Sequence, residues 1–195
     1  METRRVISYE QVVDAAVRLF HTTGRLDMEE LASATAVSRA TLYRVAGSRD
    51  RVLGDVLWRQ GHRLLVSVEA AVAGRGLDRL LTISERFQRE LRDYPPLKTF
   101  LREDPGTAFR VLLMGEARVH SRLVDHWRGL LEDAVTRGEA VLPMPPAEAA
   151  LVFVRLGEAM VYSDLLGDGE PDFELAARVQ RSVLQVTPRA IPGWP

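Results

Sequence analysis

The chain has 195 residues, of which 46% are hydrophobic and 27% charged, and its formal net charge is -1. This length suits one large domain or two small ones, and the hydrophobic content is ordinary for a globular protein. The absence of cysteine excludes disulfides and thiolate metal sites. No apolar run is long enough to span a membrane, and the first residues, METRRVIS, lack the apolar core of a signal peptide. We therefore expect a cytoplasmic protein with no membrane partner.

Helical patterns recur along the chain, and no segment shows the sustained two-residue alternation, enriched in β-branched residues, that a strand would show. We predict an all-α fold. Capping patterns mark the first helix starts: Ser8 with Gln11, Asp27 with Glu30, Ser38, and Ser48. The predicted helices cover residues 8–23, 27–34, 39–45, 48–73, 77–93, 97–102, 105–113, 115–138, 147–166 and 172 to about 186. The tail TPRAIPGWP is too rich in proline for a helix, and we expect it to be extended or disordered.

The second and third predicted helices are short and joined by a tight turn, which is the geometry of a helix-turn-helix. The second of the pair carries donors and hydroxyls where a core helix would carry apolar side chains. Such groups suit the major groove of DNA and its phosphates. Four arginines gather here with Asp50 as the only acid among them: Arg39, Arg44, Arg49 and Arg51. A solvated helix face is the alternative interpretation of the same residues.

The string AVSRATLYRVAGSRDRVL, with Leu31 and Ala32 before it, resembles the signature of the TetR family of bacterial transcriptional regulators. The chain departs from that pattern in three places. Ala36 stands where the family usually has glycine, so the turn must accept a Cβ. Val45 and Ala46 replace a common aromatic pair, and Arg49 replaces the usual lysine.

This resemblance implies that the chain contacts operator DNA through the predicted recognition helix, residues 39–45. The implied DNA-binding residues are Ser38, Arg39, Thr41, Tyr43, Arg44 and Arg49. Arg39 and Thr41 would reach base edges or nearby phosphates, Tyr43 and Arg44 chiefly phosphates, and Arg49 the DNA backbone. Val37 and Leu42 are expected in the core beneath the helix. Asp27 is best explained as a helix cap.

The predicted domains are a helix-turn-helix DNA-binding domain, residues 1–47, and a helical ligand-binding and dimerisation domain, residues 48–195. The helix that begins at Ser48 joins them without a flexible linker. A rigid helix can transmit a displacement that a flexible linker would absorb.

Two amphipathic helices near the C-terminus, 147–166 and 172–184, are predicted to form a homodimer interface. The resemblance implies a four-helix bundle made from two such helices of each subunit, with Gly157 allowing close approach. The predicted interface residues are Phe153, Gly157, Met160, Phe173, Ala177 and Leu184. Ordinary packing within one chain is the alternative.

The helix over residues 115–138 is apolar over an arc too wide for a single neighbour. We predict that it borders an internal, mainly apolar cavity for a small-molecule effector. The predicted ligand-binding residues are His62, Phe87, Phe109, His120, Trp127 and Tyr162. A solid core around Trp127 is the alternative.

Glu116 and His120 have a spacing that could hold a metal, but two ligands are a weak signal, and we predict no metal and no cofactor.

The segments LYRVAGSRDRVLGDVLW and PPLKTFLREDPGTAFRVLL are similar to a TetR subgroup, the QsdR-like regulators. This similarity implies a lactone or related acyl compound as effector. We predict a ligand-responsive repressor that binds a palindromic operator as a homodimer and is released by a small molecule.

An enzyme is the rival class, but the chain lacks G-x-S-x-G, H-E-x-x-H, P-loop and G-x-G-x-x-G motifs, and we predict no catalytic residue. An all-helical adaptor or small-molecule-binding protein that does not bind DNA is the other alternative.

Overall fold

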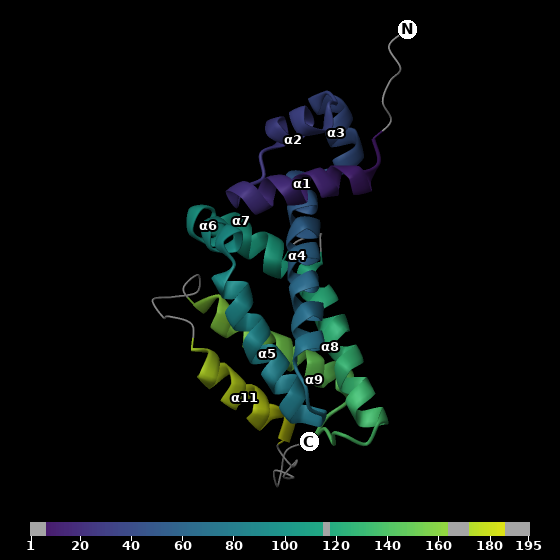
Figure 1. Cartoon of the computed structure of the whole chain (residues 1–195), viewed down its shortest axis with the longest axis vertical. Coiled ribbons are helices and arrows are strands. Elements are labelled where there is room, and N and C mark those ends of the chain that lie inside the picture. The colour runs from purple at the N-terminus through teal and green to yellow at the C-terminus, as the bar shows by residue number, and fades with distance from the viewer. Residues whose placement is uncertain (1–6, 115–117, 164–171, 186–195) are drawn as a thin grey trace, which may run out of the picture. The chain divides into compact units, whose positions relative to one another are not determined.

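The computed structural model describes residues 7–114, 118–163 and 172–185, and every regular element in these ranges is a helix (Figure 1). The all-α prediction is therefore confirmed. In chain order the elements are α1 (Tyr9–Thr23), α2 (Met28–Thr35), α3 (Arg39–Ala46), α4 (Arg49–Ala71), α5 (Gly76–Asp93), α6 (Pro95–Glu103), α7 (Pro105–Phe109), the π-helix η1 (Arg110–Met114), α8 (Val119–Thr136), α9 (Pro146–Val161) and α11 (Phe173–Gln185). Within the described ranges, none of these helices is both long and apolar enough to cross a membrane.

Several predicted features lie outside the described residues. They are the start of the 115–138 helix with Glu116, the end of the 147–166 helix, and the C-terminal tail. The structure differs from the prediction of one α-helix over 105–113. α7 ends at Phe109, and the π-helix η1, which has wider turns, follows it.

The chain divides into two compact units. The first unit contains the described residues up to Leu64 together with Glu90–Arg122, and the second contains Leu65–Arg89 and the described residues from Leu123 onward. This division falls inside α4, and not at the predicted domain boundary after residue 47. The functional boundary at residue 48 stays a prediction.

The first three helices begin where the sequence places their caps. The hydroxyl of Ser8 accepts a hydrogen bond from the Gln11 N–H, and the Gln11 side chain accepts one from the Ser8 N–H, which completes a capping box. The carboxylate of Asp27 accepts from the N–H groups of Glu29 and Glu30. These caps satisfy N–H groups that have no partner within the helix, so each helix start is fixed locally.

α1, α2 and α3 pack against one another (Figure 1), and their apolar side chains form a common core. Phe20, Leu31 and Leu42 are fully buried there. Leu42 is thus the core residue that the sequence predicts, whereas Val37 is only half-buried at the edge. α6 packs on α1, where the rings of Phe20 and Phe100 meet edge to face with centroids 5.9 Å apart.

In the second unit, α9 and α11 pack against each other. A buried polar cluster joins α5 to this pair: the Ser84 hydroxyl donates to Gln180 Oε1 at 3.1 Å, and Gln88 Nε2 donates to the Ser84 hydroxyl at 2.7 Å. Gln180 Nε2 in turn donates to the Phe153 carbonyl at 2.9 Å. The cluster lies beside Gly157, where a Cβ would come within 3.1 Å of Gln88 Nε2 and 3.2 Å of Gln180 Nε2.

The turn between α2 and α3 accepts a side chain at Ala36, as the sequence requires. Ala36 has φ 53° and ψ 42°, which is the left-handed region. Its N–H donates to the Ser33 carbonyl, and the Val37 N–H donates to the Ala32 carbonyl, both at 3.1 Å. A residue with a Cβ is strained by about 1–2 kcal/mol in this conformation, whereas glycine is not.

Ala36→Gly should therefore stabilise the protein. The relief of strain exceeds the entropy that glycine loses on folding, about 0.5–1 kcal/mol, so we expect a net gain of about 0.5–1 kcal/mol in the free energy of unfolding. Urea denaturation followed by circular dichroism would measure it. The matched control is Ala34→Gly, two residues earlier in helical conformation, which should lose about 0.5–1 kcal/mol. A loss of stability in both variants would refute the strain at Ala36.

The cap at Asp27 should make stability depend on pH. Hydrogen bonds from the N–H groups of Glu30 and then Glu29 hold the pKa of Asp27 below its ordinary value. A carboxyl whose pKa is lowered by folding stabilises the protein at pH values above its unfolded pKa of about 3.9. That stabilisation disappears as the pH falls through the folded pKa. Asp27→Asn keeps an acceptor for the cap but cannot titrate.

The wild type should thus exceed Asp27→Asn in unfolding free energy at pH 7, and the difference should shrink below about pH 4. Urea denaturation across this pH range would measure it. Asp27→Ala is the control for the cap itself and should lose about 1 kcal/mol at pH 7. A difference between wild type and Asp27→Asn that does not change with pH would contradict the lowered pKa.

Candidate functional site

The helix α3 has one buried side and one exposed side, as a recognition helix requires. Leu42 and Ala46 are buried beneath it, while Arg39, Tyr43 and Arg44 are exposed. Residues four apart lie on the same side of a helix, and the guanidinium of Arg39 lies 6.0 Å from the centroid of the Tyr43 ring. The buried side chains fix the helix, and the exposed ones are left to contact another molecule.

Ser38 and Thr41 shape the start of α3. The Ser38 hydroxyl accepts a hydrogen bond from the Thr41 N–H at 3.2 Å and donates to the Thr41 hydroxyl at 3.1 Å. This is the cap that the sequence predicts. Ser38 is exposed and Thr41 half-buried, so both oxygens lie at the edge of the exposed side of the helix.

Arg39 has a partner that the sequence analysis missed. Its Nη1 lies 2.5 Å from Oε1 of Glu29 on α2, and both side chains are largely exposed. An exposed pair of this kind contributes only about 0–1 kcal/mol, so a phosphate or a base could replace Glu29 at low cost. The two residues are ten apart across the turn, a separation at which no helical spacing rule applies.

Arg49 has a more internal position than the resemblance implies. Its Nε donates to the Leu26 carbonyl at 2.8 Å, and its Nη1 lies 3.6 Å from Asp104. Arg49 therefore ties the start of α4 to the segment before α2, and a contact between Arg49 and DNA stays a prediction. The neighbouring acid, Asp50, pairs with Arg110 at 2.8 Å, which offsets the one negative charge among the clustered arginines.

The six predicted ligand-binding residues are divided between the two units. His62, Phe109 and His120 belong to the first unit, and Phe87, Trp127 and Tyr162 belong to the second. His62 stacks on Trp58 with ring centroids 4.9 Å apart. Trp127 is 2% exposed and packs against Phe153 with centroids 4.7 Å apart. This contact gives Trp127 a packing role, and its contact with an effector stays a prediction.

The predicted dimer residues fall into two groups. Phe153, Gly157 and Leu184 are buried within their own chain, and their part in a dimer interface stays a prediction. Beside Gly157, the amides of Gln88 and Gln180 leave only tight space for a side chain. Met160, Phe173 and Ala177 remain half-buried. The same two helices expose Leu151, Val152 and Leu175, which the prediction omitted.

A pocket of about 410 Å³ lies within the second unit, and none of the predicted ligand-binding residues lines it. Its walls are largely charged, in contrast to the apolar cavity that the sequence analysis predicts. Among the described residues there is no group of three histidine, aspartate or glutamate side chains that could hold a metal ion. Glu116, half of the weak metal pattern, is not among them.

Residues 75–185, more than half of the chain, match the family described as Tetracyclin repressor-like, C-terminal domain. Two curated relatives, each named as an uncharacterised HTH-type transcriptional regulator of Mycobacterium tuberculosis, are 34% identical over 98 residues. That match covers 48% of this chain and 48% of each relative, so the chain spans about half the length of the curated relatives it matches.

Two solved structures resemble the chain along nearly all of its length. The transcriptional repressor QsdR of R. erythropolis, from the TetR family, is 25% identical with a TM-score of 0.86, over 94% of this chain and 97% of that one. The fatty acid degradation regulator FadR from Bacillus halodurans is 15% identical with a TM-score of 0.54 over the same shares, which shows a similar fold. The predicted class, a regulator and not an enzyme, agrees with these relatives. This chain belongs to the TetR family of transcriptional regulators.

Proposed function

We propose that this protein is a repressor that binds a palindromic operator as a homodimer and leaves it when a small molecule binds. The observation that carries the proposal is α3, a short helix fixed by Leu42 with Arg39, Tyr43 and Arg44 exposed on its other side. Exposed arginine and tyrosine on a recognition helix suit guanine edges and phosphates in the major groove. The similarity to QsdR, which is itself a transcriptional repressor, supports repression.

A dimer is part of the proposal because one recognition helix reads only half of a palindrome. Two such helices must lie about 34–36 Å apart, or a related distance, to enter successive major grooves. The exposed apolar residues of α9 and α11, Leu151, Val152 and Leu175, are the surface that we assign to the partner subunit. The half-buried Met160, Phe173 and Ala177 extend it.

Release by an effector requires only that the ligand favours a spacing of the recognition helices that does not fit the operator. A preference of a few kcal/mol is enough to shift such an equilibrium. The similarity to the QsdR-like subgroup favours a lactone or acyl compound as this effector. His62, Phe87, Phe109, His120, Trp127 and Tyr162 remain the proposed contacts.

Two substitutions on α3 test DNA binding. A genome-wide binding map would first supply the operator, and fluorescence anisotropy would then measure affinity for it and for single-base variants. Arg39→Ala should cost about 1–3 kcal/mol of binding free energy and relax the preference at one base pair. Tyr43→Ala should weaken binding to all sequences alike if the phenol contacts phosphate.

Arg18→Ala serves as the control for both variants, because Arg18 is an exposed arginine of α1 and does not belong to the recognition helix. It should leave the affinity for the operator nearly unchanged. Operator affinity equal to wild type in both α3 variants would reject α3 as the reading helix. Absence of DNA binding by the wild type would favour an adaptor function.

A pair of valine substitutions tests the dimer surface. Val152 on α9 is 37% exposed, and Val66 on α4 is 45% exposed. Val152→Glu places a charge on the surface assigned to the partner, so it should shift the protein to monomers in sedimentation velocity while circular dichroism stays unchanged. Val66→Glu should leave the dimer intact. A dimer that persists in Val152→Glu at the same concentration would exclude this surface.

A further inference from the structure

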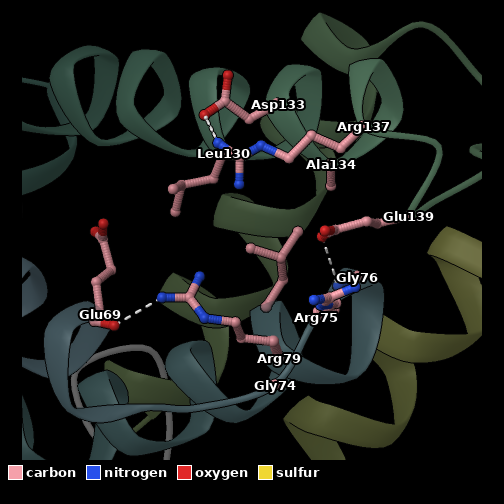
Figure 2. A pocket seen from close by; sticks show the side chains of 11 residues that line it. Glu69, Gly74, Arg75, Gly76, Arg79, Leu130, Asp133, Ala134, Arg137 and Glu139 are labelled. Atoms are coloured by element: carbon pink, nitrogen blue, oxygen red, sulfur yellow. Dashed lines mark hydrogen bonds and ion pairs between the residues drawn. The ribbon is translucent and has the colours of Figure 1, made fainter.

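The pocket in the second unit lies between the ends of three helices (Figure 2). Its walls come from the C-terminal part of α4, the loop into α5 with the first turn of α5, and the end of α8 with the residues that follow it. The lining residues are Glu69, Gly74, Arg75, Gly76, Arg79, Leu80, Leu130, Asp133, Ala134, Arg137 and Glu139. Its volume of about 410 Å³ is within the range of small-molecule sites.

Arg79 is the half-buried cation of this pocket. Its Nε donates to the Val72 carbonyl at 3.0 Å, and its Nη2 donates to the Glu69 carbonyl at 2.7 Å. Both partners are backbone oxygens at the end of α4, so within the described part of the chain no carboxylate neutralises this guanidinium. A half-buried charge without a counter-ion is costly, and an anion in the pocket would lower that cost.

The carboxylates around Arg79 are directed to other partners. Glu139 Oε2 accepts from the Gly76 N–H at 3.2 Å, and Asp133 pairs with Arg137 at 2.9 Å. The carboxylate of Glu69 pairs with His126 at 2.5 Å. Each acid in the lining thus has a side-chain or backbone partner of its own, and the unused donors of Arg79 remain available to a ligand.

A second cation and an apolar floor complete the site. Figure 2 shows Arg79 of α5 and Arg137, just after α8, on opposite sides of the pocket, with the Arg137 side chain running along α8 toward Asp133. Leu80 and Ala134 are buried and Leu130 is half-buried beside them. Arg79 has no carboxylate partner among the described residues, and Arg137 has only an exposed pair with Asp133, which a ligand carboxylate can replace at low cost. Together with the small apolar area beside them, these two guanidinium groups match a molecule with a carboxylate at one end and a short hydrocarbon part at the other.

We propose that this pocket binds a small organic carboxylate, with its charge held by Arg79 and Arg137 and its hydrocarbon part on Leu80 and Leu130. The site shares no residue with the predicted ligand-binding set. It does not depend on DNA binding, so its failure and a failure of the proposed repressor function would be distinguishable.

The test compares butyrate with butyramide, which has nearly the same shape but no charge. Both are titrated into the full-length protein at constant ionic strength maintained with sodium chloride, and the arginine Nε–Hε signals are followed by NMR. The signal missing from Arg79→Lys identifies Arg79. Butyrate should shift that signal with a saturable curve, and butyramide should not. Absence of saturable binding by butyrate, or equal binding by butyramide, would overturn the proposal.

Arg137→Gln should weaken butyrate binding about tenfold or more, because it removes a charge-assisted hydrogen bond. Since Arg137 is largely exposed and pairs with the equally exposed Asp133, this variant tests the site even if Arg79→Lys proves unstable. Arg128→Gln is the matched control on α8, because Arg128 pairs with Asp125 and Glu132 and does not line the pocket. Equal affinity in wild type, Arg137→Gln and Arg128→Gln would also overturn the proposal.

Discussion

The first unit depends on one half-buried carboxylate, that of Asp55 on α4. The Tyr9 hydroxyl of α1 donates to it at 2.6 Å, and Arg122 at the start of α8 donates to its other oxygen, also at 2.6 Å. Burial, followed by the hydrogen bond to Asp55, raises the pKa of Tyr9 to about 12, so the phenol remains a protonated donor. Arg51 lies over the Tyr9 ring at 4.5 Å. The side chain of Asp55 is 17% exposed, and losing it would leave two donors from two other helices without their shared acceptor.

Local capping chemistry explains why so much of the N-terminal fold could be predicted. Ser8, Asp27 and Ser38 each satisfy backbone N–H groups within three residues of themselves, so their effect is visible in the sequence. The exposed and buried sides of α3 also follow from helical periodicity alone. The pair of Arg39 with Glu29 could not be predicted in this way, because it forms across a turn whose geometry is set by the left-handed Ala36.

The second unit shows why an amphipathic pattern does not identify the partner of a helix face. The apolar residues of α9 and α11 have the right period for an interface, but the chain uses Phe153 and Leu184 for its own core. Arg79 illustrates the same limit for charges: the sequence analysis did not single it out, and in the structure its donors reach the carbonyls at the end of α4. The first outcome depends on contacts between helices far apart in sequence, and the second on the path of the loop between α4 and α5. Neither helical periodicity nor the local charge pattern encodes these contacts.

The glycine at position 157 has a consequence for how related sequences can vary. Its missing side chain leaves room for the amides of Gln88 and Gln180, which belong to α5 and α11. Three positions separated by dozens of residues therefore share one small volume. An alanine at this place would require the two amides to move by a few tenths of an ångström, so a change at one of the three positions alters the room available to the other two. Substitutions at the three positions are therefore expected to be correlated, so that the summed volume of the three side chains stays nearly constant.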